Sequence, residues 1–219
     1  MNAEIVAIGS ELLTPFRQDT NSLYLTEKLN ELGVSVIFKV VVGDSLEQLT
    51  KAASQALARA DLVIFMGGLG PTEDDLTREA VATALGLPLR RDSDIVSMLE
   101  KRFAERGWKM APNNCKQADV IAGATVLQNA NGTAPGQWIA GKYDGSEKLV
   151  MLLPGPPHEL KTLFEEQCWP RLKAKVPEQS KPKQPEKKTE KVIEVLNPNA
   201  EKKSAEVGLI RRITRCEIV

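Results

Sequence analysis

The sequence is poor in aromatic side chains, histidine and cysteine, and neither sign of charge is in excess. Aromatic residues make up 5% of the 219 residues, with one histidine and three cysteines. Because Cys115, Cys168 and Cys216 are far apart and odd in number, they suit neither a disulfide framework nor a structural zinc site, and we expect reduced thiols. Basic and acidic residues each number 29. No global field therefore draws the chain to nucleic acid, and an anionic ligand must be bound locally.

Long hydrophobic runs are also missing. No stretch approaches the ~18 apolar residues of a membrane span. The first nine residues lack the basic flank and the apolar stretch of a signal peptide. Hydrophobic residues still form 42% of the chain, which is enough for one domain-sized core. These features predict a cytoplasmic protein with one main domain and no membrane partner.

The composition changes abruptly near residue 172. Residues 1–172 alternate apolar runs with glycine-rich corners, whereas residues 173–191 are mostly lysine, proline, glutamate and glutamine, which cannot support a core. We predict a folded domain over residues 1–172, a solvated linker over residues 173–191, and a tail over residues 192–219 whose role the sequence does not indicate.

Apolar runs and amphipathic segments alternate in the first third of the chain. Residues 4–9, 34–42 and 61–66 are typical of buried strands. Asp19 offers an N-cap for a helix that ends near Gly33, and residues 45–60 carry one apolar helical face. Strands that alternate with helices predict parallel pairing with right-handed crossovers. The expected fold is α/β, a three-layer α/β/α domain with a mostly parallel, doubly wound sheet.

Three loops in this scheme join glycine to polar or acidic residues. They follow the three predicted strands, at residues 9–13, 43–45 and 67–75. In sheets of this kind, ligands bind beyond the carboxyl ends of the strands. Glycine-rich turns that lead into a helix expose backbone N–H groups, which can hold a phosphate. Asp74 and Asp75, with Asp44 from the neighbouring loop, suit Mg²⁺ shared with a substrate phosphate.

Simpler interpretations of the same residues exist. Asp74 and Asp75 would also serve as caps for the following helix. The glycines would serve a tight turn alone. Asp44 would be the N-cap of the next helix, and Glu11 an exposed acid in a first helical turn. Spacing alone does not separate these interpretations from a ligand site.

Longer strings carry a resemblance to a known family. GGLGPTEDDLTRE over residues 67–79 resembles the signature of the molybdopterin-binding domain superfamily. Six further strings occur in the order found in the N-terminal domain of the CinA (competence-damage inducible) family. They are AIGSELL at 7–13, DTN at 19–21, VGD at 42–44, NNCKQA at 113–118, GTAPG at 132–136 and LPGPP at 153–157. The resemblance covers residues 1 to about 172.

The resemblance implies a homo-oligomeric domain, a dimer or trimer, that binds a pterin or a nucleotide. CinA-type domains are reported to hydrolyse ADP-ribose to AMP and ribose 5-phosphate, which would need a divalent metal ion, Mg²⁺ or Co²⁺. Asp44 and Asp75 would then be catalytic, and both would hold the metal together with Asp74. The implied substrate-binding residues are Gly9, Glu11, Asn21, Gly67, Gly68, Gly70, Pro71, Thr72, Asn114, Lys116, Pro154, Gly155 and Pro156. For Asn21, Asn114 and Lys116, surface hydrogen bonding or solvation is the simpler interpretation.

Three functional hypotheses follow, led by metal-dependent hydrolysis of ADP-ribose or a related nucleotide diphosphate. The alternatives are an enzyme of molybdenum cofactor biosynthesis that acts on a pterin, and a nucleotide-binding regulatory module without turnover. The family's C-terminal amidohydrolase-like domain is not recognisable, so nicotinamide mononucleotide deamidation is not expected. Residues 15–17, Pro-Phe-Arg, also depart from the small, glycine-containing turn that is frequent in the family.

Overall fold

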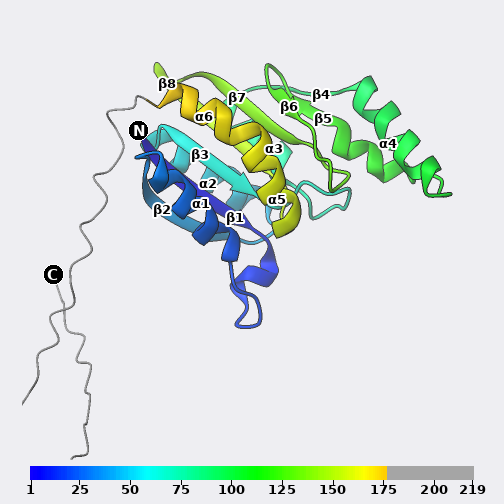
Figure 1. Ribbon diagram of the computed structural model, residues 1–219, viewed down its shortest axis with the longest axis horizontal. Helices are drawn as coiled ribbons and strands as arrows, with labels where there is room; N and C mark the ends of the chain where they lie inside the picture. The colour runs from blue at the N-terminus through cyan, green and yellow to red at the C-terminus, as the bar shows by residue number, and fades with distance from the viewer. Residues whose placement is uncertain (177–219) are drawn as a thin grey trace, which may run out of the picture. The chain divides into compact units, whose positions relative to one another are not determined.

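The computed structural model describes residues 1–176, in which six strands form one mixed sheet with helices on both faces (Figure 1). The strands are β1 (Asn2–Ile8), β2 (Ser35–Val42), β3 (Leu62–Met66), β4 (Leu89–Arg91), β5 (Asp119–Ile121), β6 (Thr125–Leu127), β7 (Gly136–Tyr143) and β8 (Ser146–Leu153). The helices are α1 (Thr20–Glu31), α2 (Leu46–Arg59), α3 (Thr77–Leu85), α4 (Ser93–Glu105), α5 (Pro157–Leu163) and α6 (Trp169–Lys175). Two 3-10 helices, η1 (Ser10–Leu13) and η2 (Pro112–Ala118), and a π-helical segment, η3 (Phe164–Cys168), complete the fold.

The sheet confirms the predicted three-layer α/β/α fold. Its strand order is β2-β1-β3-β8-β7-β6, and β4 and β5 form a separate antiparallel pair. The strands β2, β1, β3 and β8 are parallel, whereas β7 and β6 pair antiparallel. The carboxyl ends of the four parallel strands therefore meet at one edge.

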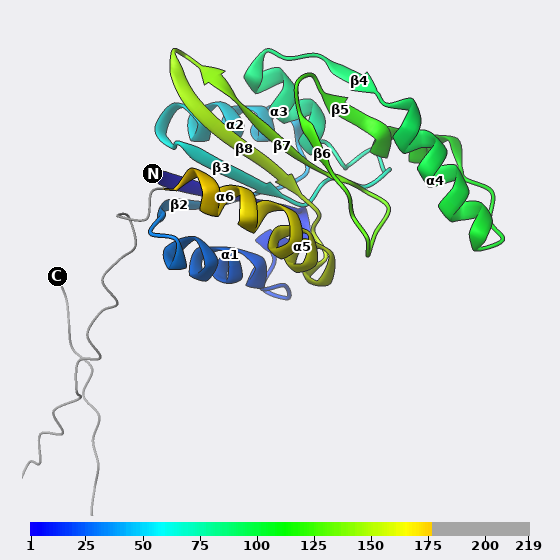
Figure 2. The same ribbon diagram turned by 45° about the horizontal axis from the view of Figure 1, so that its top comes forward.

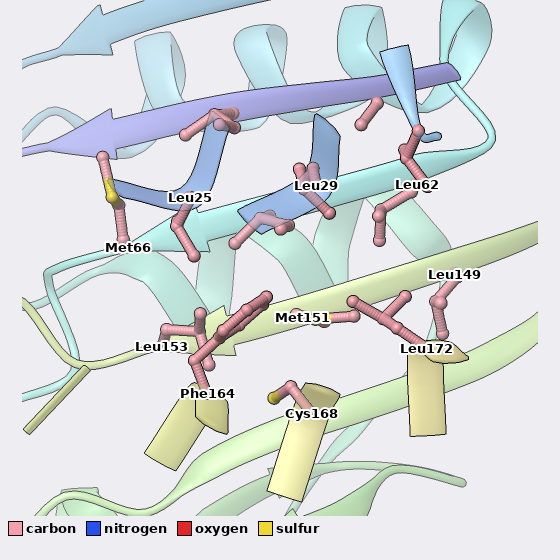
Figure 3. Packing of buried hydrophobic residues seen from close by; sticks show 14 of the residues in the cluster. Leu25, Leu29, Leu62, Met66, Leu149, Met151, Leu153, Phe164, Cys168 and Leu172 are labelled. Atoms are coloured by element: carbon pink, nitrogen blue, oxygen red, sulfur yellow. The ribbon is translucent and has the colours of Figure 1, made fainter. Parts of the chain in front are cut away.

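Two cores cover the two faces of this sheet. Helices α1, α5 and α6 lie on one face and α2 and α3 on the other (Figure 2). Strand side chains alternate between the faces, so Ile5 enters the first core and Val6 the second. In the first core, Leu25 and Leu29 of α1 face Met66, Met151 and Phe164 (Figure 3). Burial on both faces explains why the central strands are apolar throughout.

The first helices begin and end where the sequence predicts. The Asp19 carboxylate accepts a hydrogen bond of 2.9 Å from the Ser22 N–H and caps α1. Gly33, with φ of 77°, follows its end. The buried face of α2 includes Leu49, Ala53 and Leu57. The local signals in this part of the chain agree with the tertiary fold.

The described fold runs slightly past the predicted domain end at residue 172. Helix α6 continues to Lys175, and Val176 is buried against the first core. The first four residues of the predicted linker therefore belong to the folded domain. The rest of the linker and the predicted tail lie outside the described residues. Among residues 1–176, no helix is both long and apolar enough to cross a membrane.

Candidate functional site

The loops at the carboxyl ends of the parallel strands enclose a cavity of about 930 Å³. This volume falls in the range of about 300–1,000 Å³ that is usual for small-molecule sites. The three loops predicted from the sequence all line it, and the loop after β8 adds a further wall. The predicted site residues that line the cavity are Gly9, Glu11, Asn21, Asp44, Gly67, Gly68, Gly70, Pro71, Asp74, Asp75, Pro154, Gly155 and Pro156.

The glycine loop after β3 packs directly against the end of β1. Gly67 has φ of 98°, and a Cβ atom there would lie 2.4 Å from the Ile8 carbonyl oxygen. Gly68 has φ of 64°, and its Cβ would lie 2.3 Å from the Thr77 hydroxyl oxygen. Both positions therefore need glycine for conformation as well as for space. This close packing leaves the loop backbone as the wall of the cavity.

A buried arginine supports this loop from beneath. The Arg78 side chain is fully buried, and its Nη2 donates a hydrogen bond of 2.7 Å to the Leu69 carbonyl oxygen. The Thr77 hydroxyl donates to the Gly67 carbonyl oxygen at 2.7 Å. Burial lowers the pKa of Arg78 to about 10, while nearby carboxylates, Glu79 first, oppose the shift. The first turn of α3 therefore holds the glycine loop in place through two side chains.

Asp75 closes the turn that follows the glycines. Its Oδ2 accepts hydrogen bonds from the Thr72 N–H, at 2.9 Å, and from the Thr72 hydroxyl. The N-cap of α3 is Leu76, which has no side-chain cap hydrogen bond. The interpretation of Asp74 and Asp75 as caps of this helix is therefore wrong. Asp75 caps the preceding turn instead, and Asp74 is exposed at the cavity.

Asp44 connects the loops after β1 and β2. Its Oδ2 accepts a hydrogen bond of 2.8 Å from the Ser10 N–H, and its own N–H donates to the Ser10 hydroxyl at 3.1 Å. The N-cap of α2 is Ser45, so the interpretation of Asp44 as that cap is also wrong. Glu11 is exposed in the first turn of η1, as the simpler interpretation has it, and it also lines the cavity.

These acids line one cavity without forming a closed metal cage. Among residues 1–176, no three His, Cys, Asp or Glu side chains come together as a metal-binding group. Asp44 and Asp75 each use Oδ2 for an internal hydrogen bond, while Oδ1 makes none within the described residues. A cation such as Mg²⁺ takes one or two carboxylates and completes its shell with water and substrate phosphate. The oriented aspartates fit that mode of binding.

Two amide side chains, of the half-buried Asn21 and the buried Gln117, lie at the cavity wall. The Asn21 Nδ2 donates a hydrogen bond of 2.7 Å to the Gly155 carbonyl oxygen, which fixes the orientation of the amide. Its Oδ1 is buried without a hydrogen-bond partner among the described residues. Gln117, which is 3% exposed, donates from Nε2 to the Thr133 hydroxyl and also has an unpartnered oxygen. Both oxygens suit a hydroxyl or N–H donor better than a phosphate oxygen.

The geometry agrees with a comparison of the whole sequence. The family model described as "Probable molybdopterin binding domain" matches residues 4–174. The chain belongs to this molybdopterin-binding domain family.

Relatives of this domain confirm the predicted resemblance to CinA. The chain is 63% identical over 177 residues to a CinA-like protein from Koribacter versatilis, and the match covers 81% of this chain and 43% of that protein. A CinA-like protein from Solibacter usitatus is 56% identical over 179 residues, covering 82% of this chain and 42% of that protein. The domain therefore spans less than half the length of these curated relatives.

Solved structures agree with the fold of this domain. A CinA protein from Thermoplasma acidophilum, described as having unknown function, is similar with 34% identity and a TM-score of 0.68, covering 75% of this chain and 95% of that one. A molybdopterin biosynthesis protein from Mycobacterium abscessus has 22% identity and a TM-score of 0.51, covering 80% of this chain and 93% of that one. The second likeness shows the fold alone.

Three of the predicted substrate-binding residues do not line the cavity, namely Thr72, Asn114 and Lys116. Lys116 donates to the Thr72 carbonyl oxygen at 3.0 Å and pairs with Glu79 at 3.2 Å. Thr72 donates to Asp75, and Asn114 donates to the Ala111 carbonyl oxygen at 3.3 Å. Lys116 and Thr72 thus stabilise the turn that follows the glycines, and their polar atoms are taken by contacts within the chain.

Other residues of the domain line the cavity although sequence reasoning missed them. Gln117 and Thr133 lie within strings that resemble the family, which was the available signal. Glu159, in the first turn of α5, accepts a hydrogen bond of 2.6 Å from Asn129. Asp19, which caps α1, also lines the cavity. The antiparallel strand β7 brings residues 133–134 to the edge where the parallel strands end.

Proposed function

We propose that this domain binds a phosphorylated heteroaromatic small molecule of the molybdopterin class. The observation that carries the proposal is the cavity at the carboxyl edge of the sheet, with a glycine-loop wall beside two oriented aspartates. The match to the molybdopterin-binding family model supports the pterin as the first candidate. Asn21 and Gln117 also line the cavity, and a ligand hydroxyl or N–H that reached their buried amide oxygens would supply the missing hydrogen-bond donor.

The two kinds of wall suit the two parts of such a ligand. The backbone N–H groups of residues 68–70 make no hydrogen bond within the described residues and offer partial positive charge to a phosphate. Asp44 and Asp75 would hold a divalent cation, which supplies the positive charge that phosphate oxygens need beside carboxylates. Arg78 keeps the glycine loop in its binding conformation through the Leu69 carbonyl oxygen. The loop is thereby organised before the ligand arrives.

Hydrolysis of ADP-ribose or a related nucleotide diphosphate is the second candidate. The arrangement that favours it is the pair of aspartates at the cavity, each with one carboxylate oxygen that makes no hydrogen bond within the described residues. Water would attack one phosphorus, and the bond from that phosphorus to the bridging oxygen would break. The products are AMP and ribose 5-phosphate, one of which retains the bridging oxygen. Asp44 or Asp75 would orient the water. A nucleotide-binding module without turnover would use the same walls.

One experiment separates these candidates. The purified chain is incubated with ADP-ribose, NAD, nicotinamide mononucleotide or molybdopterin precursors, with and without Mg²⁺ or Co²⁺. Products are resolved by chromatography and binding is measured by calorimetry. We expect cation-dependent binding of a pterin phosphate. Formation of AMP and ribose 5-phosphate would establish the hydrolase, and tight nucleotide binding without products would establish the binding module. Absence of binding to every compound would refute the proposal.

A further inference from the structure

An exposed aromatic side chain lies at the cavity. Phe16 is 90% exposed, the highest fraction among the large hydrophobic side chains of residues 1–176. Single exposed hydrophobic residues are common on protein surfaces. Phe16 differs because it lines the cavity beside Arg17. An aromatic face that is open to solvent at a ligand cavity is available for stacking.

The segment that carries Phe16 is held at both ends. The Thr14 N–H and hydroxyl donate to the Glu11 carbonyl oxygen at 3.2 Å and 2.7 Å. On the far side, the Thr20 N–H donates to the Gln18 carbonyl oxygen at 3.1 Å. In Figure 1, this blue segment projects beyond the end of β1. These local turns fix the backbone at the two ends of the segment, and both Phe16 and Arg17 line the cavity.

The charges of the cavity wall make Arg17 distinctive. Six carboxylates line the cavity, from Glu11, Asp19, Asp44, Asp74, Asp75 and Glu159. Arg17 is the one basic side chain among the lining residues. It forms no ion pair within residues 1–176. A phosphate that enters this acidic cavity therefore meets a single free guanidinium, at the segment that also carries Phe16.

We propose that Phe16 and Arg17 form a ligand clamp, in which the Phe16 ring stacks on the heteroaromatic ring and the Arg17 guanidinium binds a phosphate. The inference rests on the proposed function and adds the residues that select such ligands. Stacking needs only a π-face, so the clamp accepts a pterin or a purine. The guanidinium forms charge-assisted hydrogen bonds to phosphate oxygens. Together the two side chains select compounds that carry both groups.

Calorimetry with five probes tests each half of the clamp in the presence of Mg²⁺. ADP-ribose and neopterin monophosphate carry a ring and a phosphate. Ribose 5-phosphate lacks the ring, and adenosine and neopterin lack the phosphate. The variants are Phe16→Ala, Phe16→Leu, Phe16→Trp and Arg17→Ala. Trp108→Ala is the matched control, because Trp108 is 62% exposed and does not line the cavity.

The expected pattern follows the chemistry of the probes. Phe16→Ala and Phe16→Leu weaken binding of the ring-bearing probes by about tenfold or more and leave ribose 5-phosphate unchanged, whereas Phe16→Trp binds like wild type. Arg17→Ala weakens the phosphate-bearing probes and spares adenosine and neopterin. Trp108→Ala changes none of the affinities.

Three outcomes would overturn the clamp. If wild type binds the ring-and-phosphate probes and neither variant changes their affinity, the clamp is wrong and the proposed function stands. If Phe16→Ala weakens ribose 5-phosphate as much as ADP-ribose, Phe16 acts on the loop and not by stacking. If wild type binds none of the five probes, the clamp and the proposed function both fail.

Discussion

Within the loops, some polar side-chain atoms hold the chain in its conformation, and others are left to contact a ligand. Asp75 illustrates the difference, because Oδ2 holds the Thr72 turn and Oδ1 makes no hydrogen bond within the described residues. We expect Asp75→Asn to keep the turn through the amide oxygen, with a change in unfolding free energy within about 1 kcal/mol. Its Mg²⁺ affinity and any cation-dependent turnover should fall by on the order of a hundredfold or more. Calorimetry and thermal melting measure the two effects.

Glu73→Gln is the matched control for this variant. Glu73 is an exposed acid two residues away that does not line the cavity. The Glu73→Gln substitution removes one negative charge from the same segment, so a general electrostatic effect would appear in both variants. Wild-type Mg²⁺ affinity in Asp75→Asn would remove Asp75 from the metal site.

Arg78 is a second test at the residue scale. Arg78→Met leaves the Leu69 carbonyl oxygen without its donor, which costs about 1–3 kcal/mol. The same change also removes a buried guanidinium whose Nε and Nη1 have no hydrogen-bond partner in the described chain. The free energy gained by removing that unsatisfied charge is of similar size and offsets the loss at Leu69. We therefore expect unfolding free energy to change by less than about 2 kcal/mol, while ligand affinity falls because the glycine loop loses its support. Urea unfolding and calorimetry measure the two effects. A loss of unfolding free energy above about 4 kcal/mol would contradict the expected balance, and unchanged ligand affinity would contradict the role of Arg78 in supporting the site.

At the scale of elements, the closest packing at the site is between the end of β1 and the glycine loop after β3. Gly67→Ala places a Cβ 2.4 Å from the Ile8 carbonyl oxygen, in addition to the strain of its positive φ. Gly86→Ala also has a positive φ, of 66°, but its Cβ would meet nothing within 4 Å. We expect Gly86→Ala to cost about 1 kcal/mol and Gly67→Ala about 3 kcal/mol or more. Equal midpoints of urea unfolding would show that the close approach is not tight.

The elements themselves were largely predictable in the first part of the chain. The strands at residues 4–9, 34–42 and 61–66 and the helix cap at Asp19 follow local rules, because apolar periodicity and capping depend on neighbours in sequence. The pairing of β7 antiparallel to β8 was not predicted, and this pairing brings residues 133–134 to the site. The interpretation of the aspartates as helix caps was also wrong, because Asp75 bonds the preceding Thr72 turn and Asp44 bonds Ser10, which is distant in sequence.

For the whole molecule, ligand binding and stability are linked. A ligand that binds only the folded chain adds about 2.7 kcal/mol at a concentration of 100 Kd. For a domain of this size, that corresponds to a rise in Tm of about 5–10 °C. We expect this rise with a pterin phosphate and Mg²⁺, and its loss when EDTA removes the cation. A Tm that rises equally in EDTA would contradict a role for the metal in ligand binding.

The oligomeric state of the chain stays a prediction. The resemblance to CinA implies a dimer or trimer, and β2 leaves one edge of the sheet unpaired within the described chain. On this edge strand Ile37, Phe38 and Val41 are 40%, 47% and 38% exposed. Such an edge favours pairing with a second copy. Light scattering during size-exclusion chromatography measures the mass, and a monomer at all concentrations would contradict the prediction.

The sequence by itself determined the local elements, the glycine positions and the family. These depend on periodicity, backbone conformation and strings of neighbouring residues. Only the tertiary structure decided which side chains meet: Asp44 with Ser10, and Asn21 with Gly155 across 134 residues. It also turned Lys116 away from the cavity and toward Thr72. The physical reason is that a parallel sheet gathers loops from distant parts of the chain at one edge, and no local pattern records their contacts.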